Sequence, residues 1–131
     1  QHRLSMARDA QSLQAQLAGA FRTTALYDRL VQCTANSAVA DDALWLQLEE
    51  FLDANANGFV GQLRQFYLQI KPQELYVCCL IKVDFNNSQI ANMLCRTQQA
   101  VTNMRKRLYF KMFNKDGAAD DLNSFIRLFP Y

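Results

Sequence analysis

The sequence has few of the residues that interrupt helices. Its 131 residues include only four Gly and two Pro. No stretch alternates apolar and polar residues for long enough to indicate a strand at the surface of a sheet, and apolar residues recur mostly at helical spacing. The sequence therefore predicts an all-α protein.

The sequence also lacks the groups that most catalytic or metal sites need. Its single histidine, His2, lies at the amino end. There is no phosphate-cradling glycine loop, no nucleophile beside a candidate base and no metal-ligand spacing. Paired acids occur at 41–42, 49–50 and 120–121, but adjacent residues on a helix point in different directions, and helix-start acids are explained by capping and the helix dipole. We therefore expect no enzyme activity, no cofactor, no metal and no small-molecule ligand.

No apolar run approaches the roughly 18 residues that span a membrane, and the amino end lacks the apolar core of a secretory signal. These absences predict a soluble, cytoplasmic chain. The sequence begins without Met and directly inside a helical pattern. This start suggests a longer polypeptide whose upstream region carries a sensor or a membrane anchor.

The four cysteines form no Cys-x-x-Cys pair. Their even number is compatible with two disulfides, although the adjacent pair Cys78-Cys79 cannot easily bridge to itself within a helix. All four lie in apolar helical stretches, where a free cysteine behaves as a small hydrophobic residue. We interpret Cys33, Cys78, Cys79 and Cys95 as reduced core residues.

The small net charge of +2 hides an asymmetry along the chain. Residues 1–60 hold four basic and seven acidic side chains, whereas residues 61–131 hold ten basic and five acidic ones. The span 96–115 contains six basic residues and no acid. Such a cluster favours nucleic-acid binding, because neutralising phosphates releases counterions.

Residues 1–20 predict one amphipathic helix. Its apolar residues follow the 4-3-4-3 spacing of a coiled-coil seam, in Met6, Ala10, Leu13, Leu17 and Ala20. Two heptads leave two alternatives equally open: a dimerising coil that continues upstream, or a linker helix packed on its own domain.

Residues 21–70 predict a helical subdomain packed on the unit that follows. Thr23 or Thr24 caps a helix to about residue 33, and a break follows at Asn36-Ser37. Asp41 or Asp42 caps a helix over 43–54, the turn 55–58 ends it, and a short helix follows over 59–68. The expected inward residues are Leu26, Tyr27, Leu30, Val31, Leu44, Trp45, Leu48, Phe51, Leu52, Val60, Leu63, Phe66 and Tyr67.

Residues 71–131 predict a helix-turn-helix unit. Pro72 suits the first turn of a helix that ends near Asp84. Asn86 or Asn87 caps a second helix, in which Ile90, Ala91 and Leu94 face inward. The short turn 95–97 follows, and Thr97 caps a third helix from Gln98, which matches a helix-turn-helix joint. A last short helix, 122–128, is capped by Asp120-Asp121.

The third helix has the two faces of a recognition helix. Its expected buried stripe is Val101, Met104, Leu108 and Met112. The expected base-reading residues near its amino end are Gln98, Gln99, Thr102, Asn103 and Lys106, because amide, hydroxyl and ammonium groups recognise base edges in the major groove. The expected phosphate-binding residues are Arg96, Thr97, Arg105, Arg107 and Lys111.

These segments resemble the LuxR/GerE family of helix-turn-helix domains over about 45 residues. The matching runs are Pro72-Gln73-Glu74-Leu75, Phe85-Asn86-Asn87-Ser88-Gln89-Ile90-Ala91 and Ala100-Val101-Thr102-Asn103-Met104-Arg105-Lys106-Arg107-Leu108. The run 74–81, with 105–109 and Lys115-Asp116-Gly117, is similar to C-terminal domains of Bacteroidetes regulators, which often follow a membrane span and a sensor region. The chain departs from the family at the turn, where Cys95 replaces the usual Gly, and on the third helix, where Thr102 replaces a basic residue and Met104 a His.

The resemblance implies sequence-specific binding of double-stranded DNA as the output domain of a bacterial transcription regulator. Thr102, Asn103 and Lys106 are the strongest residues it carries over to DNA contact. It also implies a homodimer, for which the first helix and the last helix are the two candidate interfaces. The alternative is a protein-interaction module that keeps the helix-turn-helix shape and contacts polymerase or another regulator.

Overall fold

The computed structural model describes residues 2–35 and 41–130, of which residues 2–11 are described by their backbone alone. Over these residues the chain is all helical, with eight α-helices and no strand. In chain order the helices are α1 (His2–Arg22), α2 (Ala25–Ala35), α3 (Asp42–Asn55), α4 (Phe59–Phe66), α5 (Pro72–Lys82), α6 (Asn87–Met93), α7 (Gln98–Phe113) and α8 (Ala119–Leu128). The all-α prediction is confirmed.

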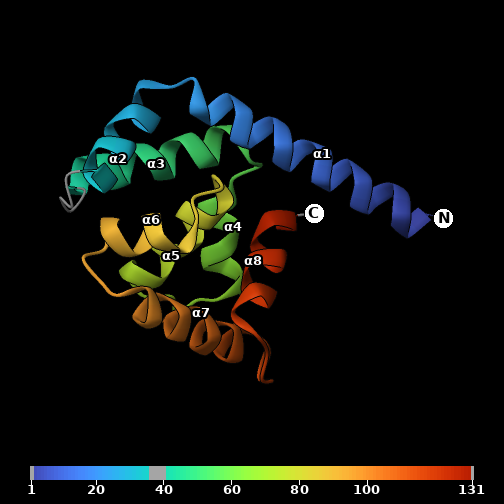
Figure 1. Ribbon diagram of the computed structural model, residues 1–131. Helices are drawn as coiled ribbons and strands as arrows, with labels where there is room; N and C mark the ends of the chain where they lie inside the picture. Colours follow the sequence, from blue (N-terminus) through green and yellow to red (C-terminus); the bar gives the residue numbers. More distant parts are fainter. Residues whose placement is uncertain (1, 36–40, 131) are drawn as a thin grey trace.

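The helices are arranged around α5 and α6, which lie in the middle of the bundle (Figure 1). Helices α1, α2 and α3 run along one side, with α2 against α6 and α3 against α5. Helix α7 lies on the opposite side, against α6 and α5. Helix α8 packs on α5, α7 and α1. The amino-terminal part of α1 extends beyond the other helices (Figure 1).

Several helix starts are capped where the sequence predicts it. The Thr24 hydroxyl accepts a hydrogen bond from the Tyr27 N–H at 3.1 Å, and the Asp41 carboxylate accepts one from the Leu44 N–H at 2.9 Å. Each cap satisfies a backbone N–H that has no partner within its helix. The expected break at Asn36-Ser37 lies outside the described residues.

One hydrophobic core joins the helices α1 to α4 to the helices α5 to α8. Its fully buried side chains come from all eight described helices, and include Phe21, Leu30, Leu48, Leu63, Leu80, Ile90, Leu108 and Leu122. The single tryptophan, Trp45 of α3, is buried and stacks on Tyr76 of α5, with ring centroids 4.1 Å apart. The predicted subdomain 21–70 therefore packs directly on residues 71–131.

Two apolar patterns differ from the prediction. In α1, Leu17 is buried, but Leu13 is 59% exposed and Ala20 is exposed, while Ala18 and Phe21 are buried instead. Helix α1 contacts α8 and α2, and these neighbours decide which of its side chains are covered. The side chains of Met6 and Ala10 lie outside the described residues.

In α4 the predicted inward residue Phe66 is 46% exposed, and Phe59 is buried. Phe66 lies at the last position of the helix, where its ring meets Phe113, Phe125 and Phe129 at the rim of the core, with centroids 5.8, 5.2 and 5.7 Å away. The side chain therefore packs on other aromatic rings and still faces solvent.

The cysteines are all free thiols. Cys78 and Cys79 are buried in α5, and burial raises the pKa of both thiols above its ordinary value, so both remain neutral. Cys33 is partly buried. The prediction of a core position is wrong for Cys95, which is exposed because it lies in the turn before α7, with φ of 52°. Glycine adopts such a left-handed conformation more readily than cysteine does.

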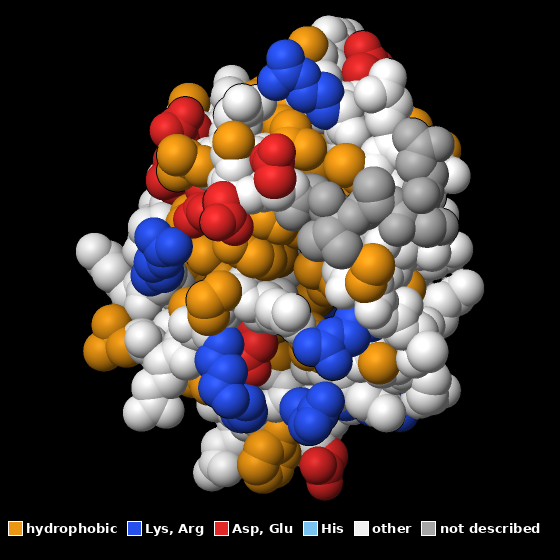
Figure 2. All heavy atoms as spheres, turned by 90° about the vertical axis from the view of Figure 1, so that its left-hand side faces the viewer, with side chains coloured by type: hydrophobic (Ala, Val, Ile, Leu, Met, Phe, Trp, Pro, Cys, Tyr) orange, Lys and Arg blue, Asp and Glu red, His pale blue; other side chains and the backbone are white. Residues whose placement is uncertain are grey.

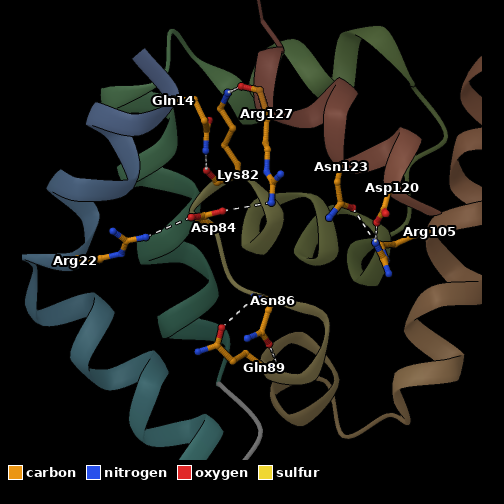
Figure 3. A network of polar contacts seen from close by, with 10 residues as sticks. All are labelled: Gln14, Arg22, Lys82, Asp84, Asn86, Gln89, Arg105, Asp120, Asn123 and Arg127. Carbon is orange, nitrogen blue, oxygen red and sulfur yellow. Dashed lines mark hydrogen bonds and ion pairs between the residues drawn. The ribbon is translucent and has the colours of Figure 1, made fainter. Parts of the chain in front are cut away.

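Polar side chains attach α1 to the helix-turn-helix unit (Figure 3). The Gln14 amide donates to the Lys82 carbonyl oxygen at 2.7 Å. Arg22 of α1 and Arg127 of α8 both approach the carboxylate of Asp84, at 3.3 and 3.4 Å. Asp84 lies two residues after the end of α5, so a single acid connects the ends of three helices.

Across the part of the chain that the structure describes, no helix combines the length and apolar character needed to cross a membrane. In the same part, no group of three or more His, Cys, Asp and Glu side chains is placed to hold a metal ion.

Candidate nucleic-acid interface

Helices α5, α6 and α7 are held in a helix-turn-helix arrangement by local hydrogen bonds. Asn86 and Gln89 cap α6 reciprocally, each side chain accepting from the other residue's backbone N–H at 2.9 Å. The hydroxyl of Thr97 accepts from the Ala100 N–H at 3.0 Å and so begins α7 where the sequence predicts. The Asn87 amide donates to the Gln98 carbonyl oxygen at 3.1 Å. The start of α6 is thereby tied to the start of α7.

One side of α7 faces the core, as the predicted stripe requires. Val101 and Leu108 are buried, and Met104 and Met112 are partly buried against the core. Ile90, Ala91 and Leu94 of the α6 segment are buried as well. Because a helix turns by 100° per residue, the opposite side of α7 must face away from the bundle.

The predicted base-reading residues lie mainly on that outer side. Gln98, Gln99, Asn103 and Lys106 are exposed, and Thr102 is partly buried. Gln99 and Asn103 lie one turn apart, and the Gln99 Nε2 donates to the Asn103 Oδ1 at 3.0 Å. Helix α7 packs on α5, α6 and α8, which leaves this face turned outward at the edge of the bundle (Figure 1).

The predicted phosphate-binding residues have three different environments. Arg96, Arg107 and Thr97 are exposed, and the Arg96 guanidinium donates to the Gln73 amide oxygen of α5 at 2.9 Å. The Thr97 hydroxyl is used as the helix cap described above. Lys111 pairs with the buried carboxylate of Glu74 at 3.0 Å, with its own side chain 39% exposed. Glu74 also accepts from the Lys71 N–H at 2.9 Å, so this acid caps α5 and binds α7 to it.

Arg105 does not face solvent. It is only 7% exposed and points toward α8, where its guanidinium donates to Asn123 at 3.1 Å and lies 3.5 Å from the Asp120 carboxylate (Figure 3). Its position on α7 is one turn from Val101, on the side that α8 covers. The structure thus gives Arg105 a role in joining α7 to α8, and this placement does not support the predicted phosphate contact.

The Arg105 contact predicts a loss of stability on truncation. We expect Arg105→Ala to lower the free energy of unfolding by roughly 1–3 kcal/mol, because the partly buried Asn123 amide loses a charge-assisted hydrogen bond. Arg107→Ala, which removes an exposed arginine from the same helix, should change it by less than about 0.5 kcal/mol. Urea denaturation of both variants measures the difference. Equal stability of the two variants would contradict the assigned role of Arg105.

Charge is distributed unevenly over the side of the molecule that contains the start of α7. In Figure 2, lysine and arginine side chains gather in the lower part, at the height of α7 in Figure 1, whereas acidic side chains are more frequent above. The lower part of this view also contains acidic side chains. The exposed cations of α7 and its preceding turn that make no described ion pair are Arg96, Lys106 and Arg107.

Two features of this face were not expected from the sequence. Phe110 is 47% exposed, one turn after Lys106 on the outer side of α7. Phe110 follows Asn103 and Lys106 at helical spacing, and this pattern in the sequence would have predicted that it lies on the same outer face of α7. The contacts of Arg96 with Gln73 and of Lys111 with Glu74 join residues far apart in sequence, and no local pattern reveals them.

Compared with family models, curated proteins and solved structures, the chain has no match among them.

Proposed function

We propose that the protein binds double-stranded DNA in a sequence-specific way, as the output domain of a transcription regulator, with α7 in the major groove. The observation that carries the proposal is the outer face of α7, where Gln99, Asn103 and Lys106 are exposed together on the side opposite the core. The resemblance to LuxR/GerE domains agrees with this assignment. The proposed role would place the protein in the cytoplasm.

The surrounding charge supports the same proposal. Arg96 lies in the turn before α7, and Arg107 lies next to Lys106, so exposed cations border the amide-bearing face. Amides can read base edges, whereas the cations can neutralise phosphates and fix the register of the helix on the duplex. We assign the base-reading face of α7 to Gln98, Gln99, Thr102, Asn103 and Lys106, and phosphate binding to Arg96 and Arg107. Lys111 is left out of the phosphate-binding set because its ammonium pairs with Glu74.

The experiment is selection from random duplex DNA across a salt series, with the variant Thr102→Ala/Asn103→Ala/Lys106→Ala beside the wild type. We expect the wild type to select a motif and the variant to bind that motif at least about tenfold more weakly, because each bidentate base contact is worth roughly 1–3 kcal/mol. The matched control is Arg29→Ala/Gln32→Ala/Gln47→Ala, which removes one cation and two amides from α2 and α3, on the other side of the bundle. It should bind as the wild type does.

Two further readouts test parts of the proposal. Arg107→Ala should reduce the dependence of affinity on salt by about one phosphate contact, without changing the selected motif. Two inverted half-sites about 34 Å apart in the motif would support a homodimer. Failure of the wild type to bind any duplex at low salt would contradict the proposed function.

A second candidate, a protein-interaction module, is favoured by one observation. Phe66 is 46% exposed, and its ring lies against those of Phe113, Phe125 and Phe129, with centroids 5.8, 5.2 and 5.7 Å away. Apolar side chains that cluster at the surface mark contact sites for proteins. In this case DNA affinity would be weak and would show little preference for sequence. The salt series above therefore distinguishes the two candidates.

A further inference from the structure

The paired amides on α7 hold each other in a defined orientation. Gln99 Nε2 donates to Asn103 Oδ1 at 3.0 Å, and both side chains are exposed. An amide side chain can exchange the places of its oxygen and nitrogen by a 180° rotation. Accepting a hydrogen bond selects the orientation in which the oxygen faces the donor. The Asn103 oxygen then lies toward the amino end of α7, and its nitrogen keeps both N–H donors free.

This orientation leaves Asn103 with a donor and an acceptor side by side. The oxygen has a second lone pair after accepting from Gln99, and the nitrogen has its two hydrogens. In the major groove, adenine offers the N7 acceptor next to the N6 amino donor. Guanine offers two acceptors, cytosine offers a donor, and thymine offers an acceptor and a methyl group. Adenine is the base whose edge matches the free edge of Asn103.

We propose that Asn103 reads the major-groove edge of one adenine in each binding site, and that Gln99 is the positioning residue that holds the Asn103 amide for this contact. The inference rests on the proposed DNA binding and adds the base and the division of roles to it. The N6 amino group donates to Asn103 Oδ1, and Asn103 Nδ2 donates to N7. Holding the amide in advance reduces the side-chain freedom lost on binding.

The test uses the whole chain and the motif obtained from selection. Each adenine of the motif is replaced in turn by 7-deazaadenine, which has a C–H in place of the N7 acceptor and keeps the pairing edge. We expect one position at which this replacement weakens binding by the wild type about tenfold, the range of one lost bidentate contact. Asn103→Ala should bind the unmodified motif about tenfold more weakly and should be insensitive to 7-deazaadenine at that position.

Gln99→Ala separates positioning from direct reading. It should bind more weakly than the wild type and keep its sensitivity to 7-deazaadenine at the same position, because Asn103 is still present. It should also keep the base preference at every other position of the motif, and a preference lost elsewhere would show that Gln99 reads a base directly. The matched control is Asn92→Ala, an exposed asparagine of α6, which should bind as the wild type and retain the full sensitivity. Circular dichroism of the variants checks that the helices are intact.

The outcomes separate this inference from the proposed function. A wild type that selects a motif but tolerates 7-deazaadenine at every adenine overturns the inference and leaves DNA binding in place. Sensitivity that persists in Asn103→Ala overturns it as well, because another residue would then read that adenine. A wild type that binds no duplex overturns both.

Discussion

Phe21→Ala should lower the free energy of unfolding by about 3–5 kcal/mol, the usual effect of emptying a fully buried phenylalanine site. Phe21 has no exposed surface, and its ring lies 5.6 Å from Tyr27, 5.3 Å from Phe51 and 6.0 Å from Phe85, measured between centroids. These partners belong to α2, α3 and the turn between α5 and α6. One ring at the end of α1 therefore holds α2 and α3 against the turn between α5 and α6.

The measurement is urea denaturation followed by Trp45 fluorescence and by circular dichroism. Trp45 reports on the contact of α3 with α5, and circular dichroism reports on all helices, so a shared core should give coincident transitions at lower urea concentration in the variant. Leu13→Ala removes an exposed leucine from the same helix and should change stability by less than about 0.5 kcal/mol. A loss below about 1 kcal/mol in Phe21→Ala, or two separate transitions in the wild type, would show that the two parts are not joined through this ring.

The second large effect concerns the pH dependence of stability at Lys82. This lysine is 5% exposed, and its Nζ donates to the carbonyl oxygens of Arg127 at 2.9 Å and Phe129 at 2.7 Å, 5.5 Å from the centroid of the Phe59 ring. Burial disfavours the charged ammonium and lowers the pKa of Lys82 to about 8, from its ordinary 10.5. A neutral amine keeps two N–H donors, which suffice for the two carbonyl groups at the end of α8.

The sign of the effect follows from proton binding. Below about pH 8 the folded and unfolded states both carry the Lys82 proton, so this group gives no pH dependence. Between about pH 8 and 10.5 the unfolded state keeps the proton and the folded state releases it, and the free energy of unfolding therefore rises with pH. The two pKa values correspond to a gain of at most about 3 kcal/mol.

Comparison with Lys82→Met isolates this contribution. The raised thiol pKa values of Cys78 and Cys79 make the folded state less stable at high pH. This opposite effect is the same in the wild type and in Lys82→Met, so it cancels when the free energy of unfolding of one is subtracted from that of the other. The stability of the wild type relative to Lys82→Met should therefore increase from pH 8 to pH 10.5 in denaturant titrations. Lys106→Met, at an exposed lysine, should show no such change. If the free energy of unfolding of the wild type relative to Lys82→Met stayed constant or fell between pH 8 and pH 10.5, Lys82 would keep its proton in the folded protein.

The local signals in the sequence were sufficient to predict where most helices begin. Asp41, Asn86 and Thr97 cap the helices that they were expected to cap, because a cap depends on a side chain and a backbone N–H two or three residues away. In the same way, Pro72 begins α5. At the last helix the prediction was less accurate: α8 begins at Ala119, and Asp121 caps it by accepting from the Ala118 N–H at 2.8 Å.

The sequence predicted which residues of the candidate interface are exposed better than it predicted which side chains they contact. Gln99, Asn103 and Lys106 are exposed as expected, because each lies opposite the buried stripe of Val101 and Leu108 on one helix. Helical periodicity alone determines that opposition. The hydrogen bond between Gln99 and Asn103 is also local, since residues four apart on a helix are neighbours.

The sequence by itself thus determined the helical class, most of the caps and the outer face of α7, because these depend on residues within one or two turns of each other. Only the tertiary structure decided which cations of α7 are available. Arg105 is buried because α8 brings Asn123 and Asp120 against it, and Lys111 is paired because α5 brings Glu74 to it. Whether a charged side chain meets solvent or a partner depends on helices that are distant in sequence, and no periodicity within α7 contains that information.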